Sequence, residues 1–404
     1  MTQIEHIIDL SQYLKCFFEE TYKVHYSDNY HQKELLINNL KDRINTIIIY
    51  SDDNKAYSIL LYLIEIFNDM IKIGRQPWSY KNVVNITNWI VNKLVKNCIF
   101  SDNLLTNEIY KFGCMIGNYK LIKCAFDNKF HPDHMFIAEP IDMEHNYSCN
   151  GLYYVLLVWL EEDERIKIYN LFIEYGFNTD NLIKPIQYKS YCCNILERAF
   201  YNYMKLTERI LRIGCDIDKN SLHDLARCIG FYNPKKMKNK NRLKYVIDTI
   251  ISKTLKKYGT LDIARKGYMD FMNTPLAHLC HNLYTYHNHV SHKFVNKWYI
   301  INKETIVEYF IKQLIIYGVN IGHIIDIKNK IYMDEHGKMI YNQFQKMITN
   351  KIIPRKQAIE FVRNVNIGTG ILPDIANVVF DHYSEFRQNN HYDLAANAYN
   401  YSTG

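Results

Sequence analysis

Residues 171–180 read LFIEYGFNTD and residues 209–218 read RILRIGCDID. Residues 313–322, QLIIYGVNIG, show the same order: an apolar helical pattern that includes a polar residue, then a glycine and a short turn. Glycine suits this position because it adopts the left-handed conformation that ends a helix without a Cβ clash. We therefore expect Gly176, Gly214 and Gly318 each to end a helix with positive φ.

Two further stretches resemble this closing phrase. Residues 125–133, AFDNKFHPD, carry Lys129 where the others have glycine, and Gly259 lies in KKYGTLDI (256–263). Asn and Asp follow several of the closures, and these side chains favour turns by bonding to their own backbone. The closures therefore indicate a series of helices separated by turns.

Helical periodicity also covers the chain before residue 100. Residues 32–48, 54–73 and 83–98 each place apolar side chains at three- and four-residue steps. The chain has only 15 Gly and 8 Pro in 404 residues, whereas 48% of its residues are apolar and 14% aromatic. Such a composition can bury a large core but offers few tight turns for a β fold. The sequence predicts an all-α protein.

The order of helices and closures resembles the ankyrin repeat. Asn273-Thr-Pro-Leu276 is similar to that family's opening turn, Gly117 to its glycine between two helices, and the closures to its final Gly-Ala-Asp-Val-Asn. The closures lie farther apart than the family's period of ~33 residues, so the repeats would carry insertions. The resemblance implies a helical-repeat solenoid of ankyrin-like helix pairs at 101–325. A helical N-terminal region or cap (1–100) would precede it, and a C-terminal helical region (326–388) and a flexible tail (389–404) would follow.

The resemblance also implies a function. Stacked repeats bind proteins through their turn tips and concave face, without catalysis or cofactors. Candidate partner contacts are then Phe177, Asn178, Thr179, Asp216, Ile217, Asp218, Val319 and Asn320. The bias toward Ile, Asn, Lys and Tyr is typical of an AT-rich genome, and divergent ankyrin arrays of this kind are similar to those of large DNA viruses. We expect the partner to be a protein, whose identity the sequence does not give. We expect binding to occur in the cytoplasm, which would be that of the host cell if the protein is viral.

A basic segment supports a second hypothesis, nucleic-acid binding through residues 233–257. The stretch 233–244, NPKKMKNKNRLK, has no acidic residue and contains Lys235, Lys236, Lys238, Lys240, Arg242 and Lys244. Clustered cations bind phosphates by releasing counterions. A net charge of +7 over the whole chain is mild, however, and a solvated insertion loop accounts for the segment more simply. We favour the protein partner.

A cluster of histidines supports a third hypothesis, a metal-dependent enzyme. His278, Cys280, His281, His287, His289 and His292 fall within 15 residues, and such side chains bind zinc. No pair of closely spaced cysteines accompanies them, and the chain has no recognisable catalytic motif. We expect no metal site, with His278 packed between helices and His287–His292 in an exposed loop. The ten cysteines are expected to be free thiols in a reducing compartment.

The C-terminal stretch 370–386, GILPDIANVVFDHYSEF, resembles the end of a ubiquitin-ligase adaptor box of the F-box or SOCS-box type. A simple capping helix would show the same pattern, and both interpretations stay open. The first ten residues, MTQIEHIIDL, are not typical of a signal peptide, and no apolar run approaches the ~20 residues that a membrane span needs. We expect no membrane association.

Overall fold

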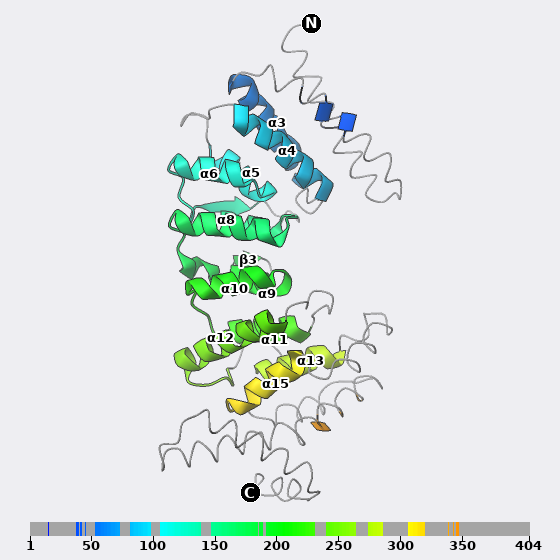
Figure 1. Ribbon diagram of the computed structural model, residues 1–404, viewed down its shortest axis with the longest axis vertical. Coiled ribbons are helices and arrows are strands. Elements are labelled where there is room, and N and C mark those ends of the chain that lie inside the picture. Colours follow the sequence, from blue (N-terminus) through cyan, green and yellow to red (C-terminus); the bar gives the residue numbers. More distant parts are fainter. Residues whose placement is uncertain are drawn as a thin grey trace, which may run out of the picture. The chain divides into compact units, whose positions relative to one another are not determined.

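The computed structural model describes residues 53–72, 81–97, 106–138, 147–184, 186–188, 191–230, 240–263, 274–285 and 306–319. It also describes isolated positions at 15, 38, 39, 41, 42, 45, 338, 342, 345 and 346. The chain divides into two compact units, Met1–Cys215 and Asp216–Gly404. Described residues of both units are mostly helical (Figure 1), so the predicted helical class is confirmed.

The first unit contains eight helices among its described residues, which follow one another in pairs. They are α3 (Asp53–Lys72), α4 (Lys81–Asn97), α5 (Asn107–Ile116), α6 (Tyr119–Asp127), α7 (Gly151–Leu157), α8 (Glu162–Glu174), α9 (Ile195–Asn202) and α10 (Met204–Ile213). A short 3₁₀ helix, η2 (Thr179–Leu182), lies between α8 and α9. The bounds of α3 and α4 agree closely with the predicted helices at 54–73 and 83–98, whereas 32–48 lies mostly outside the described residues.

Within this unit each pair packs against the next through both of its helices. The first helices contact one another in the order α3, α5, α7, α9, and the second helices in the order α4, α6, α8, α10. Figure 1 shows these pairs as successive rows along residues 53–213. Aromatic rings join the pairs edge to face: Phe67 and Phe112 have centroids 5.1 Å apart, and Phe126 and Phe172 5.0 Å. Such contacts add about 0.5–1.5 kcal/mol beyond the area they bury.

The predicted closing glycines are confirmed. Gly176, Gly214 and Gly318 have φ of 89°, 105° and 98°, and each follows the last residues of a helix. Gly259 also has a positive φ, of 74°. Lys129 has φ 68° and is the one non-glycine residue with positive φ among those described. The lysine therefore occupies the same left-handed position that glycine holds at the other closures.

Two short β-hairpins add to the predicted helices. Strand β1 (Met135–Ala138) pairs antiparallel with β2 (Tyr147–Asn150), and β3 (Ile186–Tyr188) pairs antiparallel with β4 (Tyr191–Cys193). Each hairpin lies between the second helix of one pair and the first helix of the next. Neither sheet exceeds two strands, so the hairpins are compatible with the predicted helical class.

The second unit has four helices among its described residues: α11 (Ser221–Gly230), α12 (Lys240–Tyr258), α13 (Pro275–Thr285) and α15 (Ile306–Ile316). Helix α11 contacts the other three, and α12 also packs against α15. Thr274 accepts a hydrogen bond from the Ala277 amide at 3.3 Å, as expected for the opening turn of α13. None of the helices described in either unit combines the length and apolar character needed to cross a bilayer.

Candidate functional site

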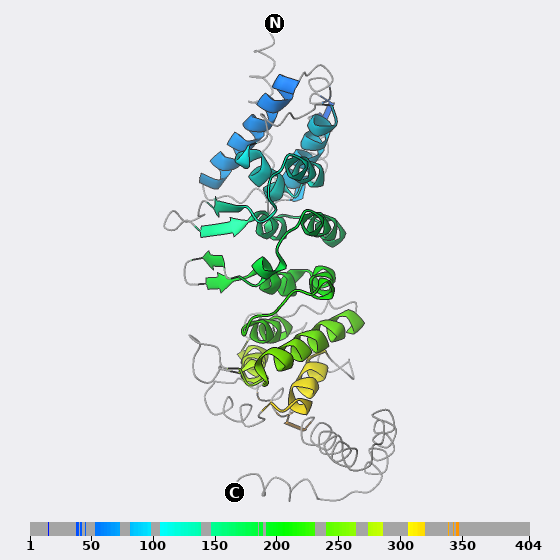
Figure 2. The same cartoon turned by 90° about the vertical axis from the view of Figure 1, so that its left-hand side faces the viewer.

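The two hairpins lie next to each other and form one candidate site, which we call the hairpin face (residues 135–138, 147–150, 186–188 and 191–193). Strand β2 contacts β3, and Figure 2 shows both hairpins on the same side of the helix pairs. Each hairpin leads directly into an asparagine that caps the following helix. Asn150 Oδ1 accepts from the Tyr153 amide at 3.1 Å, and Asn194 Oδ1 accepts from the Glu197 amide at 2.7 Å. The caps fix the point at which each hairpin joins the helix that follows it.

A carboxylate ties the closing turns of consecutive pairs together. The Asp133 carboxylate accepts hydrogen bonds from the Asn178 amide, at 3.1 and 3.2 Å, and from Asn181 Nδ2 at 2.5 Å. Asn178 is exposed and Thr179 half-buried, so these two predicted contacts lie at the surface. Asp133, in the closing turn of the preceding helix pair, holds the Asn178 amide and so orders the surface of this turn.

Three of the predicted partner contacts belong to the core. Phe177, Ile217 and Val319 are only 5%, 0% and 2% exposed. Phe177 and Val319 directly follow a left-handed glycine and donate their amides to the carbonyls of Phe172, at 2.9 Å, and Leu314, at 3.0 Å. This is the Schellman geometry, in which the residue after the glycine folds back onto the helix and packs an apolar side chain there. We therefore correct the expectation: Phe177 and Val319 close helices, Ile217 is buried in the turn after α10, and none of the three is available to a partner.

The remaining predicted contacts serve turns or lie outside the described residues. Asp216 is exposed and pairs with Lys257 Nζ at 2.5 Å, and the hydrogen bond from this ammonium lowers the pKa of the carboxyl. Asp218 Oδ1 accepts from Ser221 Oγ at 2.7 Å and from the Asn220 amide at 3.1 Å, which stabilises the start of α11. Asn320 lies outside the described residues.

The basic segment is only partly described. Lys235, Lys236 and Lys238 lie outside the described residues, and Lys240 belongs to the first turn of α12. Arg242 and Lys244 are half-buried on α12, and Lys244 Nζ lies 4.7 Å from the centre of the Tyr309 ring. The described end of the segment therefore packs against the neighbouring helix as well as meeting solvent.

The histidine cluster is likewise divided. His278 is 2% exposed on α13, and its ring centre lies 6.1 Å from that of His223 on α11, so its predicted packing between helices is confirmed. Cys280 is buried on α13. The side chain of His281 and the whole of His287, His289, His292 and the 370–386 stretch lie outside the described residues. Within the described part of the chain, no three His, Cys, Asp or Glu side chains are grouped to hold a metal ion.

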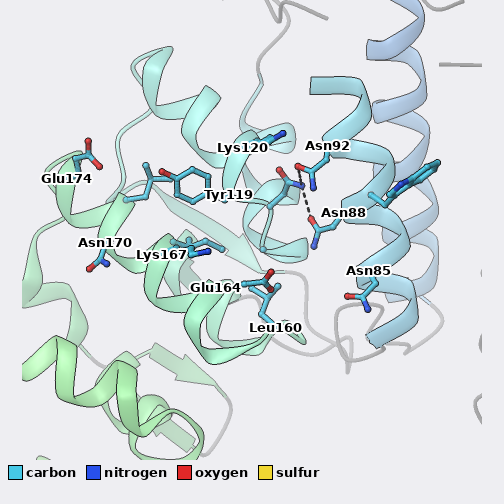
Figure 3. A pocket seen from close by; sticks show the side chains of 15 residues that line it. Asn85, Asn88, Asn92, Tyr119, Lys120, Leu160, Glu164, Lys167, Asn170 and Glu174 are labelled. Carbon is cyan, nitrogen blue, oxygen red and sulfur yellow. Dashed lines mark hydrogen bonds between the residues drawn. The ribbon is translucent and has the colours of Figure 1, made fainter. Parts of the chain in front are cut away.

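A groove that was not predicted from the sequence lies on the second helices of the pairs in the first unit. The groove has a volume of about 800 Å³ and is lined by the second helices α4 and α8 and by the turn between α5 and α6 (Figure 3). Helix α4 contributes Asn85, Asn88, Trp89 and Asn92; the turn and start of α6 contribute Gly117–Lys120; and α8 contributes chiefly Glu164, Lys167, Asn170 and Glu174. The signal was present in the sequence, because asparagines at 85, 88 and 92 share one helical face. We call this site the asparagine groove.

The floor of the asparagine groove is held by a hydrogen-bond network. Asn118 caps α6 through its Oδ1, which accepts from the Leu121 amide at 2.9 Å. Its Nδ2 donates to Asn88 Oδ1 at 2.8 Å and to Asn92 Oδ1 at 3.4 Å. Asn88 Nδ2 in turn donates to the Ile116 carbonyl at 2.8 Å. Because Asn118 is only 2% exposed, the network holds the carboxamides of Asn88 and Asn92 from the buried side of the groove.

No family model, curated protein or solved structure matches this chain. The two candidate sites are therefore interpreted from their own geometry.

Proposed function

We propose that this protein is a non-catalytic scaffold that binds another protein through the hairpin face, on an array of degenerate ankyrin-like repeats. The observation that supports this most is a recurring structural order. The chain twice runs through the same order of elements: a helix pair, a left-handed closing residue, a hairpin and a helix capped by asparagine. The closing residue is Lys129 the first time and Gly176 the second.

Stacking explains why the hairpins are the surface to consider. A helix pair that packs against neighbours on both sides buries those faces, and the elements between pairs remain available for partners. Met135, at the start of β1, is a large apolar side chain that is 49% exposed, whereas the next strand residue, Phe136, is buried, so the two point to opposite faces of the hairpin. An apolar side chain held on an ordered strand is a suitable contact for a protein partner.

The cellular setting remains part of the proposal. The described cysteines Cys114, Cys124, Cys149, Cys215, Cys228 and Cys280 are free thiols, which supports a reducing compartment such as the cytoplasm. A viral origin and a host partner are consistent with the composition. Nucleic-acid binding, an adaptor role and metal-dependent catalysis rest mainly on residues outside the described part, and they stay hypotheses.

A matched pair of surface substitutions tests the hairpin face. Partners would be captured from extracts of the native host with the wild-type chain, and the purified partner's affinity measured. Met135→Lys should weaken binding at least about tenfold, because it places a charge at an apolar contact. Leu61→Lys is the control, since Leu61 is 39% exposed on α3 and is not a residue of the hairpin face. Equal affinity for all three proteins would contradict the proposed face.

A further inference from the structure

The asparagine groove differs from the hairpin face in both position and chemistry. Strand β2 contacts the first helix α7, whereas the groove is lined by the second helices α4 and α8. Its volume of about 800 Å³ lies within the range of roughly 300–1,000 Å³ typical of binding sites. The lining combines apolar surface with polar groups, which are carboxamides on the α4 wall and charges of both signs on the α8 wall (Figure 3).

The polar groups of the two walls retain hydrogen-bonding capacity toward the groove. Asn85 is exposed on α4, and within the described residues its carboxamide takes no hydrogen-bond partner. The Asn92 oxygen accepts from Asn118, which orients the side chain and leaves its NH₂ group able to donate. On α8, Glu164 and Lys167 are exposed and form no ion pair with any described residue. The groove thus offers donors and acceptors that the fold itself leaves unused.

The charges of the groove argue against a polyanionic ligand. Lys120 and Lys167 are balanced by Glu164 and Glu174, so the lining has no net charge. Nucleic acids are attracted by clustered cations, and their affinity depends on the phosphates that those cations neutralise. A site with balanced charges fits a ligand that carries both signs or neither.

A peptide main chain matches the carboxamides. Each peptide unit presents one N–H donor and one C=O acceptor, and an asparagine carboxamide supplies the complementary acceptor and donor in one group. Asparagines at 85, 88 and 92 follow one face of α4, so an extended segment lying along that helix meets them in turn. Trp89 lies on this wall and Tyr119, 41% exposed, at the end of the floor. Such rings supply large contact area at low entropic cost.

We propose that the asparagine groove binds an extended peptide segment of another protein. The asparagines of α4 recognise its main chain, and the oppositely charged pair Glu164 and Lys167 selects among its side chains. This site is independent of the hairpin face, and either one can fail without the other.

A defined probe tests the groove. Wild-type protein is panned against a phage-displayed library of random twelve-residue peptides, and the affinities of enriched peptides are then measured. Asn85→Ala should lower the affinity of the enriched peptides about five- to tenfold, because it removes a carboxamide that donates to and accepts from the peptide main chain. Lys96→Ala, an exposed change on the same helix outside the groove, should leave the affinity unchanged. Met135→Lys on the hairpin face should also leave it unchanged.

The charge pair gives the sharper readout. The same library is panned against the double variant Glu164→Lys with Lys167→Glu, which has the net charge of the wild-type protein. The peptides that it enriches should carry their acidic and basic residues in the opposite order to those that the wild-type protein enriches. Selection of the same sequences by both proteins would overturn the role of the pair. The proposal itself is overturned if no enriched peptide depends on Asn85. It is also overturned if a glycan array, and not the peptide library, yields the ligands that Asn85→Ala abolishes.

Discussion

Lys129 adopts a backbone conformation that glycine holds at Gly117, Gly176, Gly214, Gly259 and Gly318. For a residue with a Cβ this left-handed conformation costs roughly 1–2 kcal/mol. Its amide donates to the Phe126 carbonyl at 3.0 Å, and the next amide, that of Phe130, donates to Ala125 at 3.1 Å, which completes the helix closure. The hydrogen bonds of the turn and the packing after it therefore hold the lysine in place against its own preference.

Lys129→Gly should stabilise the protein. Glycine removes the steric cost of positive φ, and the gain is offset in part by the larger entropy of glycine in the unfolded chain. The free energy of unfolding in urea should rise by about 0.5–1 kcal/mol. The matched control is Lys123→Gly within α6, which should lower it by at least about 1 kcal/mol, because it lowers helix propensity and removes the exposed bonds of Lys123 to Asp127 and Tyr175. A destabilised Lys129→Gly protein would contradict the strain assigned to this turn.

Replacing a glycine of positive φ by alanine should destabilise the protein by different amounts at Gly214 and at Gly117. A Cβ at Gly214 meets no heavy atom within 4 Å, whereas one at Gly117 would lie 2.3 Å from Leu160 Cδ1. Gly214→Ala should thus cost only the backbone term of about 1 kcal/mol, and a bulkier Gly214→Val at least as much. Gly117→Ala adds overpacking of typically 1–3 kcal/mol. Thermal unfolding measures the two losses of stability. If Gly214→Ala destabilises the protein as much as Gly117→Ala or more, the close approach of Leu160 to Gly117 does not add to the cost of a side chain there.

At the scale of elements, the helices were predictable and the hairpins were not. Apolar spacing and closing glycines act over ten or more residues, so α8 and α10 are visible in the sequence. Strands β1 to β4 have three or four residues each, too few for an alternating pattern to show. A different signal was available: Tyr147-Ser-Cys-Asn150 and Tyr191-Cys-Cys-Asn194 have the same form, and each ends a hairpin at a helix cap.

The burial of Phe177 was also accessible to sequence reasoning. An apolar residue directly after a closing glycine is the expected packing residue of a Schellman motif, and a contact role was assigned to it from the family resemblance alone. The asparagine groove required more than one element to be placed. Its walls come from α4 and α8, far apart in sequence, and only tertiary packing brings Asn88 to Asn118.

The caps that join hairpins to helices should contribute measurably to stability. Asn194→Ala should lower the free energy of unfolding by about 1 kcal/mol, because the Glu197 amide loses its acceptor at a nearly buried site. Asn194→Ser is the matched control, since a serine hydroxyl also caps helix starts and should restore most of the loss. Equal stability of the alanine and serine variants, measured by urea unfolding, would rule out capping as the role of this side chain.

At the scale of the whole molecule, the division into units follows packing that the sequence pattern does not reveal. The boundary after Cys215 falls inside the region predicted as one array at 101–325, and α3 and α4 of the predicted N-terminal region pack on α5 and α6. Helical periodicity is the same on both sides of residues 100 and 215, so it marks helices without showing which of them cluster.

The core of the first unit contains phenol and thiol groups that depend on staying neutral. Burial raises the pKa of the Cys149 thiol to about 12, and it raises the pKa values of Cys114, Tyr110 and Tyr169 well above their ordinary range. Tyr110 and Cys114 lie close together near Gly151, where a Cβ would come within 2.6 Å of Cys114 Sγ. An anion formed there would face packed apolar surroundings, which strongly disfavours charge.

Stability of the first unit should therefore fall at alkaline pH. These groups have a higher pKa folded than unfolded, so their contribution is complete below the unfolded values and is lost as pH rises toward the folded ones. Cys149 alone should account for about 1–2 kcal/mol between about pH 7 and about pH 10. Urea unfolding across this range measures the slope, and near-ultraviolet absorbance of tyrosinate reports whether the buried phenols ionise together with unfolding. Cys149→Ala is the control: it should be less stable at neutral pH, because it leaves a cavity, yet lose less stability as pH rises. A free energy of unfolding that stays level to about pH 10 would mean that the thiol and phenols can ionise without leaving the core.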